Sequence, residues 1–143
     1  MQKNKRVLII YTGGTIGMAE DPDTNTLVPF DFDNISSKVP ELKKFDFSVS
    51  SISFNPIVDS SEISPAIWSQ LVDIIENHYA DFDGFVILHG TDTMAYTASA
   101  LSFMVHNLQK PIVLTGSQLP LGAIRTDGKE NLLTALGIAA AQK

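Results

Sequence analysis

Three short polar segments carry the side chains of this sequence that could do chemistry. Each follows an apolar run that predicts a β-strand, and in open α/β sheets ligands bind beyond the carboxyl ends of the strands. The segments are Thr12-Gly13-Gly14-Thr15, His89-Gly90-Thr91-Asp92-Thr93 and Gly116-Ser117-Gln118. These strand-to-helix turns are therefore the first candidates for a functional site.

The first segment could present a nucleophile. Two adjacent glycines, Gly13 and Gly14, let the backbone bend and approach a ligand, which leaves N–H groups free to face a developing oxyanion. Thr15 would offer its hydroxyl beside them, but a threonine hydroxyl is weakly nucleophilic and requires a base that this segment does not contain. The alternative is a strand-ending turn in which Thr15 caps the backbone. Taken alone, the segment favours the two interpretations equally.

The second segment places a hydroxyl and a carboxylate side by side, at Thr91 and Asp92. The pair could hold a substrate ammonium or pass a proton, but both residue types are good helix N-caps, and an acid there also suits the helix dipole. By itself this segment is predicted to cap a helix. A further polar cluster, Asp59-Ser60-Ser61-Glu62, could bind the charged ends of an amino acid or merely precede a cap at Ser64.

Spacing and composition argue against other chemistry. The glycines at 13, 14 and 17 do not form the dinucleotide pattern, and residues 122–130 do not complete a phosphate loop, because Glu130 stands where Ser or Thr is required. With no cysteine, thiolate metal sites and disulfides are excluded. The three histidines show no metal-ligand spacing, so we expect neither metal nor cofactor.

The charge of the chain argues against nucleic acid as a partner. The formal net charge is -6, with no Lys/Arg cluster beyond residues 3–6, and phosphate binding is driven by clustered positive charge. We therefore expect no nucleic acid as partner.

The apolar run at 7–11 is too short for a signal peptide or a membrane span. This predicts a cytoplasmic protein without membrane attachment.

Apolar patterns predict the elements that position these segments. Continuous apolar runs predict buried parallel strands at 6–11, 84–89 and 111–115, and a weak alternation predicts a further strand within 45–54. Helices are predicted to begin at Ser64-Pro65, at Thr91 or Asp92, and at Asp127. Residues 18–32 are predicted as a long loop of the kind that forms lids. The alternation of strands and helices predicts an α/β fold with a mainly parallel sheet. The last helix, which runs to about Ala141, has no following strand, so we expect a longer protein.

Together, these segments resemble the bacterial-type L-asparaginases. Residues 11–17 and 83–94 are similar to the two signatures of that family, and residues 95–104, 115–120 and 125–128 are most similar to its cytoplasmic type I branch. The resemblance covers the whole chain but less than half of a typical member. It implies a three-layer, flavodoxin-like α/β sandwich for residues 1–143, the N-terminal domain, with the C-terminal part missing.

The resemblance also implies a reaction. L-asparagine would be hydrolysed to L-aspartate and ammonia through an acyl-enzyme on Thr15, by a homo-oligomer, a dimer or tetramer. Thr91 and Asp92 would form a second catalytic pair, with a lysine beyond Lys143. The residues implied in substrate binding are Asp59, Ser60, Ser61, Gly90 and Ser117.

One position departs from the family pattern. Leu27 stands where a lid tyrosine commonly precedes the proline matched by Pro29, and residues 18–32 contain no tyrosine. Activation of Thr15 would then rely on water, another residue or a different lid placement.

Two alternatives to an L-asparaginase stay open. One is the amidohydrolase subunit of a tRNA-dependent amidotransferase, which normally carries an additional N-terminal domain. The other is a truncated, non-catalytic module that binds an amino acid.

Overall fold

A four-stranded parallel sheet forms the centre of the molecule. The computed structural model describes residues 4–32 and 35–141. The strands are β1 (Lys5–Tyr11), β4 (Phe47–Ser53), β5 (Gly84–Leu88) and β6 (Ile112–Thr115). They lie in the order β4-β1-β5-β6, and every neighbouring pair is parallel. The predicted strands therefore exist, with β4 at one edge of this sheet beside β1.

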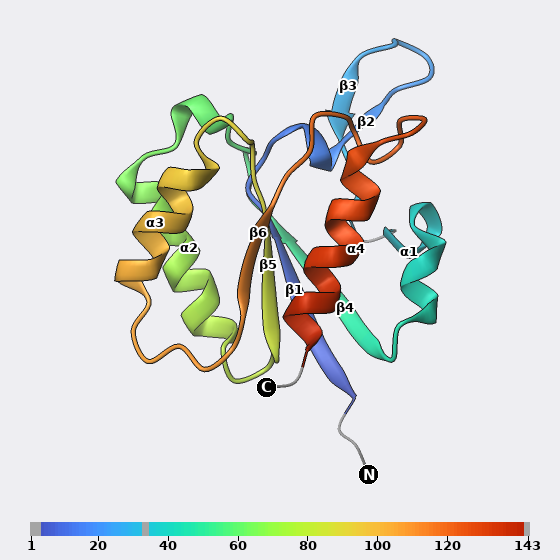
Figure 1. Ribbon diagram of the computed structural model, residues 1–143. Coiled ribbons are helices and arrows are strands. Elements are labelled where there is room, and N and C mark those ends of the chain that lie inside the picture. The colour runs from blue at the N-terminus through green and yellow to red at the C-terminus, as the bar shows by residue number, and fades with distance from the viewer. Residues whose placement is uncertain (1–3, 33–34, 142–143) are drawn as a thin grey trace.

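Helices cover both faces of the sheet. In Figure 1, α2 (Pro65–His78) and α3 (Met94–Met104) lie on one side, while α1 (Ile35–Lys38) and α4 (Asp127–Ala140) lie on the other. Short 3-10 helices occupy Thr15–Gly17, Pro40–Lys44 and Ser60–Glu62. The three layers confirm the predicted α/β sandwich.

Burial along β1 shows how the two faces are filled. Successive side chains of a strand point to opposite faces. Val7 and Ile9 therefore belong to the apolar cluster that includes Leu136 of α4. Leu8 belongs to the second cluster, which includes Leu71 of α2. Because both faces are covered, the strand reads as a continuous apolar run in the sequence.

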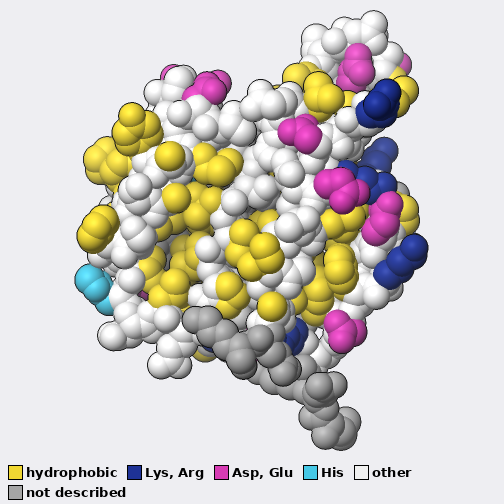
Figure 2. Space-filling view, viewed as in Figure 1, with side chains coloured by type: hydrophobic (Ala, Val, Ile, Leu, Met, Phe, Trp, Pro, Cys, Tyr) yellow, Lys and Arg dark blue, Asp and Glu magenta, His cyan; other side chains and the backbone are white. Residues whose placement is uncertain are grey.

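The edge at β6 is less covered. All four residues of β6 are partly exposed, whereas all five residues of β5 are buried. Figure 2 shows hydrophobic side chains gathered over this edge, between α3 and α4. An apolar run in the sequence thus predicts a strand but does not tell a central strand from an edge strand.

Residues 18–32, which were predicted as a long loop, contain regular structure. Two short strands, β2 (Met18–Glu20) and β3 (Leu27–Pro29), pair in antiparallel orientation. The turn between them is closed by Asp21, whose carboxylate accepts from Asp23 N at 2.8 Å and whose carbonyl accepts from Asn25 N, also at 2.8 Å. Asn25 adopts φ 52°, which Asn tolerates in turns. The prediction missed this because the strands are too short to show a period.

Two predicted helix caps are also corrected. Helix α3 begins at Met94 with Thr93 at its N-cap position, so Thr91 and Asp92 lie before the helix and do not cap it. Helix α4 begins at Asp127 as predicted, but its capping side chain is Thr126, which accepts from Gly128 N at 2.9 Å. Helix α2 has Ser64 at its N-cap position, as expected.

The described helices are short. The longest, α2 and α4, have 14 residues each. Within residues 4–32 and 35–141, no helix combines the length and the hydropathy that a bilayer span requires.

Candidate active site

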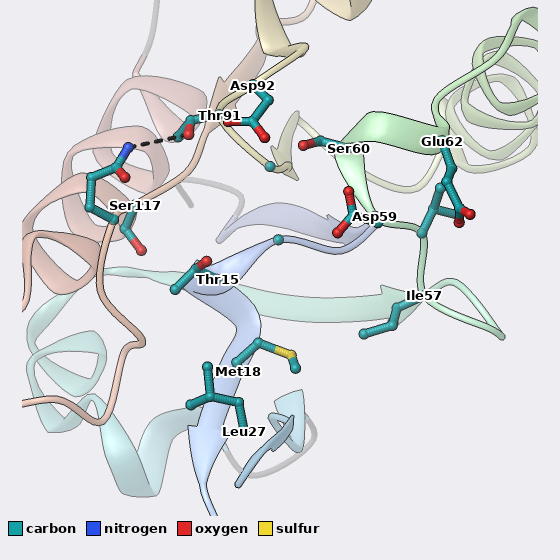
Figure 3. A pocket seen from close by; sticks show the side chains of 14 residues that line it. Thr15, Met18, Leu27, Ile57, Asp59, Ser60, Glu62, Thr91, Asp92 and Ser117 are labelled. Carbon is teal, nitrogen blue, oxygen red and sulfur yellow. Dashed lines mark hydrogen bonds between the residues drawn. The ribbon is translucent and has the colours of Figure 1, made fainter.

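A cavity of about 490 Å³ opens beyond the carboxyl ends of β1, β5 and β6 (Figure 3). It brings together residues from all three strand-end turns and from the loop after β4. The polar side chains that line it belong to Thr15, Asp59, Ser60, Glu62, Thr91, Asp92, Ser117 and Gln118. The tertiary fold therefore places the two threonines of the sequence motifs, Thr15 and Thr91, in one cavity.

Glycines let the turns approach one another. A Cβ atom on Gly14 would lie 2.6 Å from the backbone nitrogen of Gly90, closer than atoms tolerate, and φ of Gly14 is 91°. A Cβ on Gly13 would lie 1.9 Å from the carbonyl oxygen of Val58. Only glycine fits at these positions, since the turn after β1 lies against the backbone of both neighbouring turns.

The first turn leaves the Thr15 hydroxyl available. Thr12 anchors the turn, because its Oγ1 donates to the Leu88 carbonyl at 2.9 Å. Thr15 is half-buried and lines the cavity, and its hydroxyl makes no hydrogen bond within the described part of the chain. It therefore does not cap the backbone, the alternative that the sequence left open.

Tyr11 supports this turn through a hydrogen bond to its backbone. Its hydroxyl donates to the Gly14 carbonyl at 3.2 Å, and its ring is fully buried. Burial raises the pKa of Tyr11 to about 12, so the phenol stays protonated and acts as a donor. In a trans peptide the N–H points opposite to the preceding carbonyl. The Thr15 N–H is thus directed away from the Tyr11 hydroxyl.

The second turn is tied to the third. Thr91 Oγ1 accepts from Gln118 Nε2 at 3.2 Å, the hydrogen bond drawn in Figure 3. Asp92 is exposed and lines the cavity. Thr93 Oγ1 donates to the Ser60 carbonyl at 2.7 Å, which joins this turn to the loop after β4. Gln118 was quoted in the sequence motif but given no role, and a polar side chain at a strand-end turn was the only signal for it.

The polar cluster after β4 divides into cavity-lining and supporting residues. Asp59 and Ser60 line the cavity, whereas Ser61 is not among its lining residues. Ser61 instead donates to Asp59 Oδ1, from its hydroxyl at 2.7 Å and its N–H at 2.8 Å. These two hydrogen bonds hold the pKa of Asp59 below its ordinary value, so it is a carboxylate at neutral pH. Glu62, which the sequence placed in the same polar cluster but not among the residues implied in substrate binding, also lines the cavity.

The third turn is held by Asp127 of α4. Its Oδ2 accepts from Gln118 N at 2.9 Å and its Oδ1 from Leu119 N at 3.1 Å. The Gln118 N–H is the main cause that lowers the pKa of the Asp127 carboxyl. The Ser117 hydroxyl donates to the Leu119 carbonyl at 2.5 Å, so it is already engaged within the turn. Ser117 therefore lines the cavity, but the hydrogen of its hydroxyl is already donated to Leu119.

The charge of the cavity is negative. Asp59, Glu62 and Asp92 line it, and no Lys, Arg or His of the described residues does. Such a lining favours a ligand that carries an ammonium group. Met18, Leu27 and Ile57 add an apolar wall, and Leu27 reaches the cavity from the β2–β3 hairpin (Figure 3). Within the described ranges, no three His, Asp or Glu side chains cluster in a way that could hold a metal ion.

Comparison with known proteins places this chain in a family. Residues 6–143 match the family model described as Asparaginase, N-terminal. The chain therefore belongs to the asparaginase family.

Individual relatives agree with this placement. The chain is 48% identical to L-asparaginase 1 of Escherichia coli (strain K12), over 98% of this chain and 41% of that protein. It is 41% identical to the 60 kDa lysophospholipase of Mus musculus, over 97% of this chain and 28% of that protein. The crystal structure of L-asparaginase I from Vibrio cholerae superposes with a TM-score of 0.86 at 47% identity, over 96% of this chain and 41% of that chain. The chain thus spans less than half the length of these relatives.

Proposed function

We propose that these residues supply the threonine-bearing part of an active site that hydrolyses L-asparagine to L-aspartate and ammonia. The observation that carries the proposal is the Thr15 hydroxyl, which makes no hydrogen bond among the described residues and lines the same cavity as Thr91 and Asp92. Relatives named L-asparaginase support the choice of reaction.

The charges of the cavity fit an amino acid with a neutral side-chain amide. Asp59 and Asp92 provide acceptors for the substrate ammonium from two different turns. Ser60 is buried and its carbonyl accepts from Thr93, so the loop that carries Asp59 is held in place before a ligand binds. We propose Gly90, Ser60 and Ser117 as further contacts, and Ser61 as the residue that holds Asp59 in place.

The first half of the reaction forms an ester on Thr15. The Thr15 oxygen attacks the amide carbon, and the C–N bond then breaks. The hydroxyl proton is transferred to the leaving nitrogen, which departs as ammonia. The Thr15 N–H, directed away from Tyr11, is available to stabilise the oxyanion that forms in between. In the second half, water attacks the ester carbon and releases aspartate, and Thr15 regains its proton.

The described residues do not provide a proton acceptor for the Thr15 hydroxyl. No titratable side chain hydrogen-bonds to the Thr15 hydroxyl in the described part of the chain, and Leu27 offers no proton-accepting group. We propose that water relays this proton and that a lysine beyond Lys143 completes the pair formed by Thr91 and Asp92. The relatives extend well beyond the matched 41%, which leaves room for such a group. A cytoplasmic homo-oligomer, dimer or tetramer, is part of the same proposal.

The test measures ammonia release from asparagine and from glutamine by the complete polypeptide that carries these residues. We expect Thr15→Ala to lower kcat at least about a thousandfold, because the nucleophile is lost. The matched control is Thr134→Ala, which removes an exposed threonine hydroxyl from α4 and should leave kcat unchanged. Undiminished turnover by Thr15→Ala contradicts the nucleophile. Turnover of glutamine but not asparagine contradicts the substrate, and a fully active 143-residue chain contradicts the need for distal groups.

A further inference from the structure

A buried histidine, His89, directly precedes the turn that carries Thr91 and Asp92. His89 is the last residue before Gly90, and only 1% of its surface is exposed. Its Nδ1 lies 2.7 Å from the Gly90 carbonyl oxygen, and its Nε2 lies 2.8 Å from Thr97 Oγ1 on α3. Thr97 is fully buried and also receives a hydrogen bond from Trp68 Nε1 of α2 at 3.0 Å. The chain of hydrogen bonds therefore runs from α2 through α3 to the catalytic turn.

The direction of each hydrogen bond in this chain follows from chemistry. A carbonyl only accepts, so His89 Nδ1 carries the hydrogen that faces Gly90, and Nε2 of the neutral ring then accepts. An indole N–H only donates, so Thr97 Oγ1 accepts from Trp68 and turns its own hydrogen toward His89 Nε2. One tautomer of His89 satisfies every partner. Burial also lowers the pKa of His89 below its ordinary value, which keeps the ring neutral.

The tautomer decides which way the next peptide faces. His89 Nδ1–H is the only side-chain donor to the Gly90 carbonyl among the described residues, and glycine peptides flip readily because no Cβ restricts them. With the carbonyl held by His89, the Thr91 N–H of the same trans peptide points away from the ring, where Thr91 lines the cavity. That N–H donates to no acceptor in the described part of the chain. A flip would replace this donor with a carbonyl oxygen.

We infer that His89 is a positioning residue: Thr97 and Trp68 fix its Nδ1–H tautomer, and that tautomer holds the Gly90–Thr91 peptide with its N–H toward the cavity. The inference rests on the proposed function for its effect on rate. Because a donor for a developing oxyanion matters mainly in the transition state, loss of this orientation lowers kcat more than it raises KM.

The first test uses NMR to measure the tautomer of His89 and the environment of the Thr91 amide, and it does not depend on enzyme activity. In the 143-residue chain, long-range ¹H–¹⁵N spectra of the His89 ring should show the Nδ1–H tautomer at neutral pH. Thr97→Val replaces the hydroxyl with a methyl group of similar size and should shift the Thr91 amide resonance, whereas Thr97→Ser should keep its position. Ser99→Ala, which removes an exposed hydroxyl from the same helix, is the matched control. An Nε2–H tautomer, or an unmoved Thr91 amide in Thr97→Val, overturns the inference.

The second test uses ammonia release by the complete polypeptide. We expect Thr97→Val to lower kcat at least about tenfold with less than about a threefold change in KM, and Thr97→Ser to restore kcat. His89→Asn keeps an N–H where Nδ1 stands, whereas His89→Gln places its amide where Nε2 stands, so the Asn variant should retain more activity. Equal losses in both, or a change confined to KM, overturn the positioning role. If the unaltered polypeptide releases no ammonia, the proposed function fails while the spectra still decide the inference.

Discussion

The backbones of Gly14 and Gly90 lie directly against each other, so closely that a Cβ on Gly14 would lie 2.7 Å from the Gly90 Cα. This contact joins the turn that carries Thr15 to the turn that carries Thr91. The two turns follow β1 and β5, which are neighbours in the sheet. The absence of a side chain at Gly14 therefore allows the two threonine-bearing turns to approach each other this closely.

Gly14→Ala should disrupt this contact. The new methyl group meets backbone atoms, and φ of 91° is unfavourable for alanine, so we expect a loss of unfolding free energy on the order of 3 kcal/mol. Urea denaturation measures this loss. The control is Gly137→Ala in α4, where a Cβ meets nothing within 4 Å. That change should stabilise by about 0.5–1 kcal/mol, because alanine favours helices. Equal effects of the two substitutions would show that the contact is unimportant.

Asp127 should control the third turn. Its carboxylate accepts from two consecutive backbone N–H groups, at Gln118 and Leu119. We expect Asp127→Ala to lower the melting temperature and to raise KM about tenfold, because Gln118 lines the cavity. Asp127→Asn keeps one acceptor oxygen and should fall between this variant and the unaltered protein. A KM for Asp127→Ala equal to that of the unaltered protein speaks against the role of this turn in binding.

Leu27→Tyr should raise the rate. Leu27 lines the cavity together with Thr15 and is 50% exposed, so a larger side chain fits without repacking the core. A phenol there could relay the Thr15 proton, and we expect kcat to rise on the order of tenfold. Leu27→Phe adds the ring without the hydroxyl and should leave kcat unchanged if proton relay is the cause. A similar rise in both variants would point to closure of the cavity instead.

Stability should fall in mildly acidic solution because of His89. Burial lowers its pKa in the folded state below the ordinary value of 6.5, so the unfolded state binds a proton more readily. This contribution to stability is complete above pH 6.5 and is lost as the pH falls toward the lowered folded value. Urea denaturation between about pH 7.5 and 5 should show a smaller pH dependence for His89→Asn. His106→Gln, at an exposed position, is the control and should keep the slope of the unaltered protein.

Local sequence patterns anticipated the elements better than their boundaries. The strands of the sheet and the helices α2, α3 and α4 lie where apolar patterns and helix-start signals predicted them. The hairpin of β2 and β3 was missed, because three-residue strands carry no readable period. The cap of α3 was misplaced, since Thr91, Asp92 and Thr93 are all suitable capping residues, and only the backbone path decides among them.

The sequence alone determined that threonine-bearing turns follow buried strands, because apolar runs and adjacent glycines are local signals that need no knowledge of contacts. Parallel strands then bring those turns to one edge of the sheet. Only the tertiary structure decided which side chains meet there: that Glu62 rather than Ser61 lines the cavity, and that Gln118 reaches Thr91. It also decided that His89 is hydrogen-bonded to Thr97 of α3, which in turn accepts from Trp68 of α2. These relationships join residues far apart in the chain, and no local pattern records how helices and turns pack against each other.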